Sequence, residues 1–111
     1  MVYPPSDGSF PAPDRASTKE GSFPNMDNLR TVAAGQTKNQ IYELLGPPHF
    51  NEAVFHVREW NYLFHLRKAD QTVTCQYQIR FDGHGLVTAT LWKDRACEEL
   101  VGVKTADRAT D

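Results

Sequence analysis

Residues 73–92 read VTCQYQIRFDGHGLVTATLW, and this stretch decides the fold. Apolar and polar side chains alternate over residues 73–81, which is typical of a β-strand that buries one face. The apolar members are Val73, Cys75, Tyr77, Ile79 and Phe81. Residues 82–85, DGHG, supply turn chemistry, and residues 86–92 form the expected return strand. The stretch therefore predicts an antiparallel hairpin with its apolar side chains on one face.

The register of this hairpin determines which side chains remain available to a partner. Pairing Asp82 with Leu86 places Tyr77 opposite Leu91 and keeps the apolar side chains together. In that register Leu86 and Trp92 point to the opposite face, which carries the polar side chains of residues 73–81. We expect this polar face to be open.

A third strand precedes the hairpin at residues 58–66. Trp60, Tyr62, Phe64 and Leu66 alternate with more polar residues, and we expect their face to point inward. For this, the turn at residues 67–71 must bring residues of the two strands opposite each other in pairs whose residue numbers sum to an odd value. An example is Tyr62 opposite Cys75. The sequence predicts a three-stranded antiparallel meander.

Two short helices precede the meander. Residues 25–34 place apolar side chains at helical spacing behind Asn and Asp residues that are candidate caps. Thr37 and Gln40 have the form of a capping box that begins a second helix, and Gly46 with two prolines ends it. Because such short helices are unstable alone, we expect them to lie on the sheet. The predicted fold class is α+β, with two short helices on one face of the meander.

Composition limits the chain to one domain without a strong electrostatic field. It has 111 residues, a net charge of -2 and a pI near 6.0, which disfavours nucleic acid as a partner. No apolar run approaches the about 20 residues that cross a bilayer, and the first residues lack a signal-peptide pattern. Residues 1–24 are rich in proline and serine and predict a disordered tail; residues 102–111 predict a second one. The domain is expected over residues 25–101.

Cys75 and Cys97 leave two possibilities, a disulfide or two buried thiols. A disulfide would require residues 94–97 to turn back over the end of the sheet. It would stabilise so small a domain by roughly 3 kcal/mol and would indicate an oxidising compartment such as the periplasm.

Catalytic chemistry has little support in the sequence. All four serines lie in residues 1–24, which disfavours a rigid Ser-His-Asp site. The four histidines lack metal-binding helical spacing, although Glu52 and His56 could meet on a loop. We therefore expect no enzyme activity, no cofactor and no metal.

Surface contact remains as the expected activity. Trp92 and Leu86 are candidate anchors for a partner on the polar face, joined by His49, Phe50 and Phe55 from the preceding loop. Alternatively, residues 94–101 fold over that face and cover it. We expect the aromatic side chains of Trp60, Tyr62 and Phe81 to pack in the core. Thr37, Gln40 and Gly46 are expected to have structural roles at the two ends of the second helix.

The order of these signals resembles the SmpA/OmlA domain of BamE-type lipoproteins. The resemblance covers about residues 25–93. The motifs that carry it are GQTKNQIYELLGPP at 35–48, EWNY at 59–62 and IRFDGHGLV at 79–87. It implies a non-catalytic periplasmic domain of an outer-membrane lipoprotein, accessory to assembly of outer-membrane proteins or to envelope integrity. Its implied partners are another envelope protein or lipid head groups.

Residues 48–52, 75–77 and Trp92 with Cys97 further resemble a subset in which an OmpA-like domain follows and binds peptidoglycan. The lipidated cysteine of the family does not occur before Cys75. An alternative is an inhibitor or binding domain, because β-lactamase-inhibitor proteins resemble this architecture.

Overall fold

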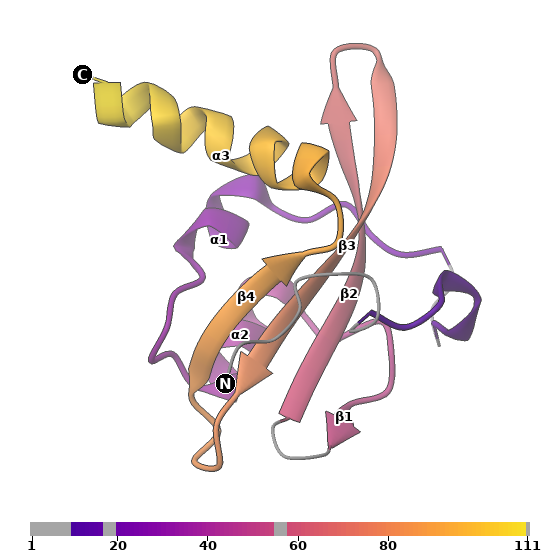
Figure 1. Ribbon diagram of the computed structural model, residues 1–111, viewed down its shortest axis with the longest axis vertical. Coiled ribbons are helices and arrows are strands. Elements are labelled where there is room, and N and C mark those ends of the chain that lie inside the picture. Colours follow the sequence, from indigo (N-terminus) through magenta and orange to yellow (C-terminus); the bar gives the residue numbers. More distant parts are fainter. Residues whose placement is uncertain (1–9, 17–19, 55–57, 111) are drawn as a thin grey trace.

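The computed structural model describes residues 10–16, 20–54 and 58–110, arranged as a twisted sheet with the α-helices on one face (Figure 1). The helices are η2 (Pro13–Arg15), α1 (Met26–Thr31), α2 (Lys38–Leu45) and α3 (Arg95–Thr110). The strands are β1 (Ala53–Val54), β2 (Arg58–Lys68), β3 (Gln71–Phe81) and β4 (Val87–Trp92). They pair antiparallel in the order β1-β2-β3-β4. The predicted α+β class and meander are confirmed, with the short β1 and the helix α3 added.

The two N-terminal helices begin where their caps predict. Asn25 accepts a hydrogen bond from the backbone N–H of Asn28 at the start of α1. Both bonds of the capping box between Thr37 and Gln40 are present in α2, which ends at Gly46 with φ of 81°. The first helix ends at Thr31, before the predicted residue 34.

The side chain of Gln36 accounts for this early end of α1. It accepts a hydrogen bond from the Ala33 N–H and donates one to the Thr31 carbonyl. These bonds satisfy backbone groups that would otherwise need another helical turn.

The β2–β3 pairing has the predicted odd sum, but it lies two residues away from the predicted example. Tyr62 pairs with Tyr77, and Phe64 pairs with Cys75. Pairing extends to Lys68 and Gln71, so the turn has only two residues, and Ala69 takes a φ of 52°. Since the parity is preserved, the aromatic side chains of β2 still point inward.

The β3–β4 pairing follows the predicted register only at the turn. The Asp82 N–H donates to the Leu86 carbonyl, and the Asp82 carboxylate accepts from the backbone N–H groups of Leu86 and His84, which lowers its pKa. A bulge beside Arg80 and Phe81 then shifts the register by one residue, so that Tyr77 pairs with Trp92 instead of Leu91. The hydroxyl of Thr88 donates to the Arg80 carbonyl at this bulge.

The bulge corrects the predicted position of Trp92. Trp92 lies on the helix-covered face and not on the polar face. The centroid of its ring is 4.3 Å from that of Tyr77. A one-residue shift moves a side chain to the other face of a strand, which is why the ungapped register placed it wrongly.

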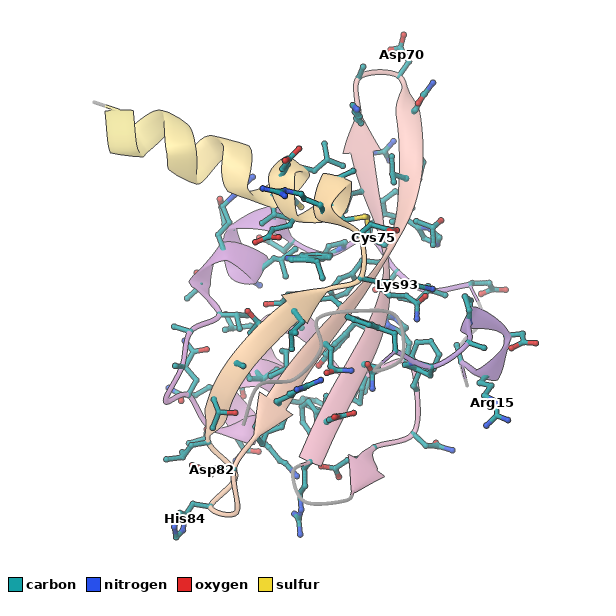
Figure 2. The ribbon with its side chains drawn as sticks, viewed as in Figure 1. Arg15, Asp70, Cys75, Asp82, His84 and Lys93 are labelled. Atoms are coloured by element: carbon teal, nitrogen blue, oxygen red, sulfur yellow. A yellow bond between two sulfur atoms is a disulfide. The ribbon has the colours of Figure 1, made fainter. Side chains whose placement is uncertain are left out.

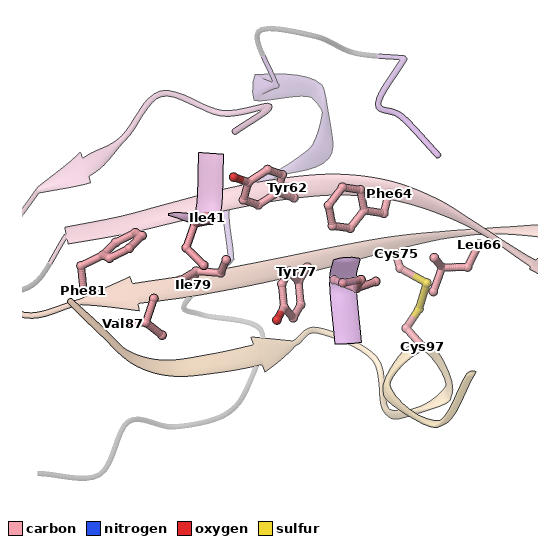
Figure 3. Close-up of a cluster of buried hydrophobic side chains, with 11 residues drawn as sticks. Ile41, Tyr62, Phe64, Leu66, Cys75, Tyr77, Ile79, Phe81, Val87 and Cys97 are labelled. Atoms are coloured by element: carbon pink, nitrogen blue, oxygen red, sulfur yellow. A yellow bond between two sulfur atoms is a disulfide. The ribbon is translucent and has the colours of Figure 1, made fainter. Parts of the chain in front are cut away.

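The core lies between the helices and the helix-covered face of the sheet (Figure 3). Ile41 of α2 and Leu29 of α1 are buried against Tyr62, Phe64 and their neighbours. The Trp60 ring meets Phe81 edge-on at 5.1 Å. The buried Tyr62 hydroxyl donates to the Gly46 carbonyl at 2.8 Å, so it ties the sheet to the end of α2.

The helix α3 lies across one end of this core. Cys97 in its first turn forms a disulfide with Cys75 of β3 (Figures 2 and 3). Leu100 and Val101 pack against the core, and the Arg30 side chain of α1 donates to the Val101 carbonyl. The helical backbone continues to Thr110, through residues for which the sequence indicates a tail. The predicted domain limits stay a prediction.

The centre of the polar face is closed, which corrects the expectation that this face is open. Asn61, Gln76, Gln78 and Arg80 are each no more than 6 % exposed. Residues 10–16 contribute to this cover, since Phe10 and Ala16 are buried and the Gln76 amide donates to the Pro11 carbonyl. Part of the proline-rich segment therefore packs on the sheet, because its few apolar side chains find a small cluster there with Phe50 and Leu63.

Candidate interaction surface

The outer edge of β2 is occupied by two other parts of the chain. Backbone N–H groups of His49 and Phe50 both donate to the Asn61 carbonyl, and Ser22 bonds to Leu63 and His65. At Gly21, a Cβ atom would lie 2.5 Å from the Leu63 carbonyl oxygen. This close approach and a φ of 68° explain the glycine.

His49 and Phe50 act here as covers of the sheet edge. His49 is 7 % exposed and Phe50 is 4 % exposed, so neither offers much side-chain surface to a partner. The structure places them against β2 and away from Trp92. Their predicted partner role is untested and stays a prediction, and Phe55 lies outside the described residues.

The hydrogen bonding of His49 fixes its proton. Its Nδ1 accepts from the Leu63 N–H at 2.9 Å, so the neutral ring carries its proton on Nε2. Burial lowers the pKa of His49, and the nearby His65 lowers it further. At the edge of β2, the neutral imidazole therefore accepts the backbone hydrogen bond that a carbonyl of a neighbouring strand would otherwise accept.

A hydrogen-bonded row crosses the polar face. The Arg80 side chain lies 3.6 Å from Glu59 and donates to Gln78, which in turn donates to Asn61 at 3.0 Å. Burial raises the pKa of Glu59 and lowers that of Arg80. Because these side chains interact with one another within the chain, we assign the row a structural role.

The opposite edge of the sheet, at β4, is the more accessible one. Among the described residues, the contacts with this edge lie at its start: the Val87 N–H donates to the Gln36 carbonyl, the Gly35 N–H donates to the Val87 carbonyl, and Leu86 pairs antiparallel with Thr37. Thr88, Ala89 and Thr90 are exposed. Leu86, a predicted anchor, is half-buried beside the covered part of this edge.

A hollow of about 390 Å³ lies between the end of β4 and α3. We call it the β4 groove; it is lined by Thr90, Leu91, Trp92, Glu98, Val101 and Gly102. Trp92 is half-buried, so one side of its ring packs on Tyr77 and the rest remains accessible beside the groove. Of the predicted partner residues that the structure describes, Trp92 alone lines this groove.

The residues that the structure describes contain no group of three or more His, Cys, Asp or Glu side chains placed to hold a metal ion. His56 of the suggested Glu52–His56 pair lies outside them. Glu52 itself forms an ion pair with Lys38 at 2.5 Å, and the Lys38 ammonium also lies 5.4 Å from the centre of the Phe81 ring.

Comparison with known proteins identifies the family of the chain. The sequence profile described as "Outer membrane protein assembly factor BamE domain" matches residues 21–90, well over half of the chain. The chain belongs to the BamE family. The match runs from the segment on the edge of β2, through both short helices, to the middle of β4.

A curated relative, the outer membrane protein assembly factor BamE of Polynucleobacter necessarius subsp. necessarius (strain STIR1), is 27 % identical over 70 residues. The alignment covers 61 % of this chain and 30 % of that protein. The solved structure of the osmotically inducible lipoprotein OsmE is similar with a TM-score of 0.47 and 19 % identity, over 73 % of this chain and 88 % of that one. None of these comparisons bears on an OmpA-like domain.

The matched BamE segment ends at residue 90, before several features of the β4 groove. Trp92, the disulfide partner Cys97 and Glu98 all follow it.

Within the described part of the chain, no helix is both long and apolar enough to span a bilayer.

Sequence reasoning missed Glu98 and Val101 as surface residues, because it left the fold of residues 94–101 undecided. A signal was present: a disulfide between Cys75 and Cys97 requires this segment to turn back over the sheet. With that geometry, residues shortly after Cys97 must lie near the end of β4.

Proposed function

We propose that this chain is a non-catalytic interaction domain that assists assembly of outer-membrane proteins. Membership of the BamE family is the observation that carries the proposal. The family implies a location on the periplasmic side of the outer membrane, with components of the β-barrel assembly machinery as partners. The disulfide is consistent with such an oxidising compartment.

The surface supports a contact role. The polar face and the β2 edge are occupied by the chain itself, whereas the β4 edge and the β4 groove are accessible. An accessible sheet edge offers backbone hydrogen bonds, and a neighbouring half-buried tryptophan offers apolar contact. Docking through β4 thus requires no rearrangement of the described fold.

The test is deletion of the gene in its host, followed by quantification of β-barrel proteins in the outer membrane. We expect their amounts to fall and to recover when the full-length gene is supplied. Unchanged amounts and an unchanged permeability barrier would contradict the proposal. If the purified chain instead formed a nanomolar complex with one enzyme, the inhibitor alternative would replace it.

An attached lipid anchor and a following peptidoglycan-binding OmpA-like domain belong to the same proposal. Intact-mass measurement of the protein isolated from membranes would detect an acylated cysteine. Sequencing of the gene beyond the codon for residue 111 would reveal or exclude the second domain.

A further inference from the structure

We infer that the β4 edge and the β4 groove bind an extended polypeptide segment carrying an apolar side chain and a lysine or arginine. This inference rests on the proposed function, because it names the kind of partner segment that the interaction domain takes. The bound segment would extend the sheet as an added antiparallel strand.

The edge of β4 already accepts an added segment within the chain. Residues 35–37 run antiparallel to its start, and Val87 exchanges two hydrogen bonds of 2.8 Å with Gly35 and Gln36. This segment then leaves the edge, because Thr37 begins α2. The following part of β4 has the same strand geometry but no added strand among the described residues.

The alternation of backbone groups identifies the free positions. The Lys93 N–H donates inward to the Gln76 carbonyl. Since successive residues of a strand direct their backbone groups to opposite sides, Thr90 and Trp92 direct theirs outward. An extended peptide can therefore exchange hydrogen bonds with both residues.

The groove beside these positions suits an apolar side chain. Leu91, Trp92 and Val101 contribute apolar surface to a volume of about 390 Å³. A strand added at the edge would direct every second side chain toward this volume. Burial there would replace water at the half-buried tryptophan ring.

The charge at the groove favours a cationic partner. Arg95 is paired with Glu99, and the Lys93 ammonium turns to the Gln76 side chain. Glu98 lines the groove and forms no ion pair with the side chains that the structure describes. A lysine or arginine of the bound segment can reach Glu98 while its alkyl stem lies along Trp92.

The test is an NMR titration of the oxidised protein with a capped peptide of alternating valine and lysine residues. We expect amide shifts at residues 88–92 and 98–102. The same peptide with N-methyl groups on alternate amides should bind at least tenfold more weakly, because it cannot complete the strand hydrogen bonds. A peptide in which glutamate replaces each lysine, with the valines kept, should also bind more weakly, because Glu98 would then repel it.

Two variants provide a matched comparison of charge. Glu98→Gln should weaken binding of the lysine peptide about two- to fivefold, while Glu99→Gln should change it less than twofold. Both positions are exposed on the same helix, so neither variant should alter the fold.

The inference would be overturned if the N-methylated peptide bound as tightly as the unmodified one, or if both variants lost the same affinity. Amide shifts confined to other residues, or no binding at millimolar peptide, would also overturn it. Concentration-dependent shifts of residues 88–92 without peptide would show instead that a second copy occupies the edge. The gene-deletion experiment separates the two proposals: a defect in β-barrel assembly without peptide binding leaves the proposed function standing.

Discussion

Removal of the disulfide should strongly destabilise the fold. Cys75 and Cys97 are 22 residues apart, and the chain-entropy expression for a loop of that length gives about 3 kcal/mol. For a domain of this size, such a loss corresponds to a melting temperature lower by about 12–24 °C. The structure assigns the effect to the attachment of α3 across the end of the core.

Urea unfolding followed by circular dichroism measures this loss. The oxidised protein is compared with the chemically reduced protein, which retains both sulfur atoms, and with the variant C75A/C97A. Both cysteines are 1 % exposed in the disulfide-bonded fold, so the variant should lose somewhat more stability than the reduced protein, because alanine also leaves small cavities. The difference between the two isolates the packing contribution.

Amide hydrogen exchange locates the same effect. Residues 97–101 should lose protection on reduction before the strands β2 and β3 do, because their contacts depend on the tether. If the reduced protein unfolds within about 1 kcal/mol of the oxidised protein, the chain-entropy reasoning is wrong for this domain.

Three further changes test the packing described above. Tyr62→Phe should cost about 1 kcal/mol in urea unfolding, because it removes the bond to the Gly46 carbonyl, whereas Tyr42→Phe at a position 53 % exposed should cost nothing measurable; equal effects would contradict this. Below about pH 6.5 the free energy of unfolding should fall, because the unfolded state takes up a proton that the buried His49, with its lowered pKa, resists. A His49→Gln variant should flatten this pH dependence, and an unchanged slope would assign it to another group. Trp92→Ala should lower stability by about 2 kcal/mol, more than Leu91→Ala, as measured by calorimetry; the reverse order would favour the register without a bulge.

The distribution of occupied and accessible surface has a consequence for function. A sheet edge that remains exposed is a site for pairing with another chain, and proteins commonly cover edges that have no such use. Here the β2 edge is covered by His49, Phe50 and Ser22, while the described residues cover β4 at its start alone. The accessible part of β4 is therefore the part of the sheet that we assign to partner contact.

The helix caps and the inward side chains of the strands were predictable because they depend on neighbouring residues. Thr37 and Gln40 form their capping box within a single turn, and the alternation around Tyr62 and Tyr77 is a property of each strand alone. The parity of the β2–β3 pairing followed from the same alternation.

The candidate surface was predictable only in part. Trp92 was identified as accessible, but its face was wrong, because the bulge beside Arg80 carries no sequence signal as clear as glycine. His49 and Phe50 were expected on a loop; their burial depends on backbone hydrogen bonds to Asn61, more than ten residues away. The contribution of Glu98 depends on α3, whose direction the sequence left open.

By itself, the sequence determined the three main strands, the two capped helices and the inward aromatic face, because local geometry and side-chain alternation suffice for each. Only the tertiary structure decided that residues 10–16 help to cover the polar face, that Trp92 turns to the helix side and that α3 borders a groove. These features arise from contacts between distant segments, such as Pro11 with Gln76 and Arg30 with Val101. Their free energy depends on the shape of the whole fold, which no local pattern encodes.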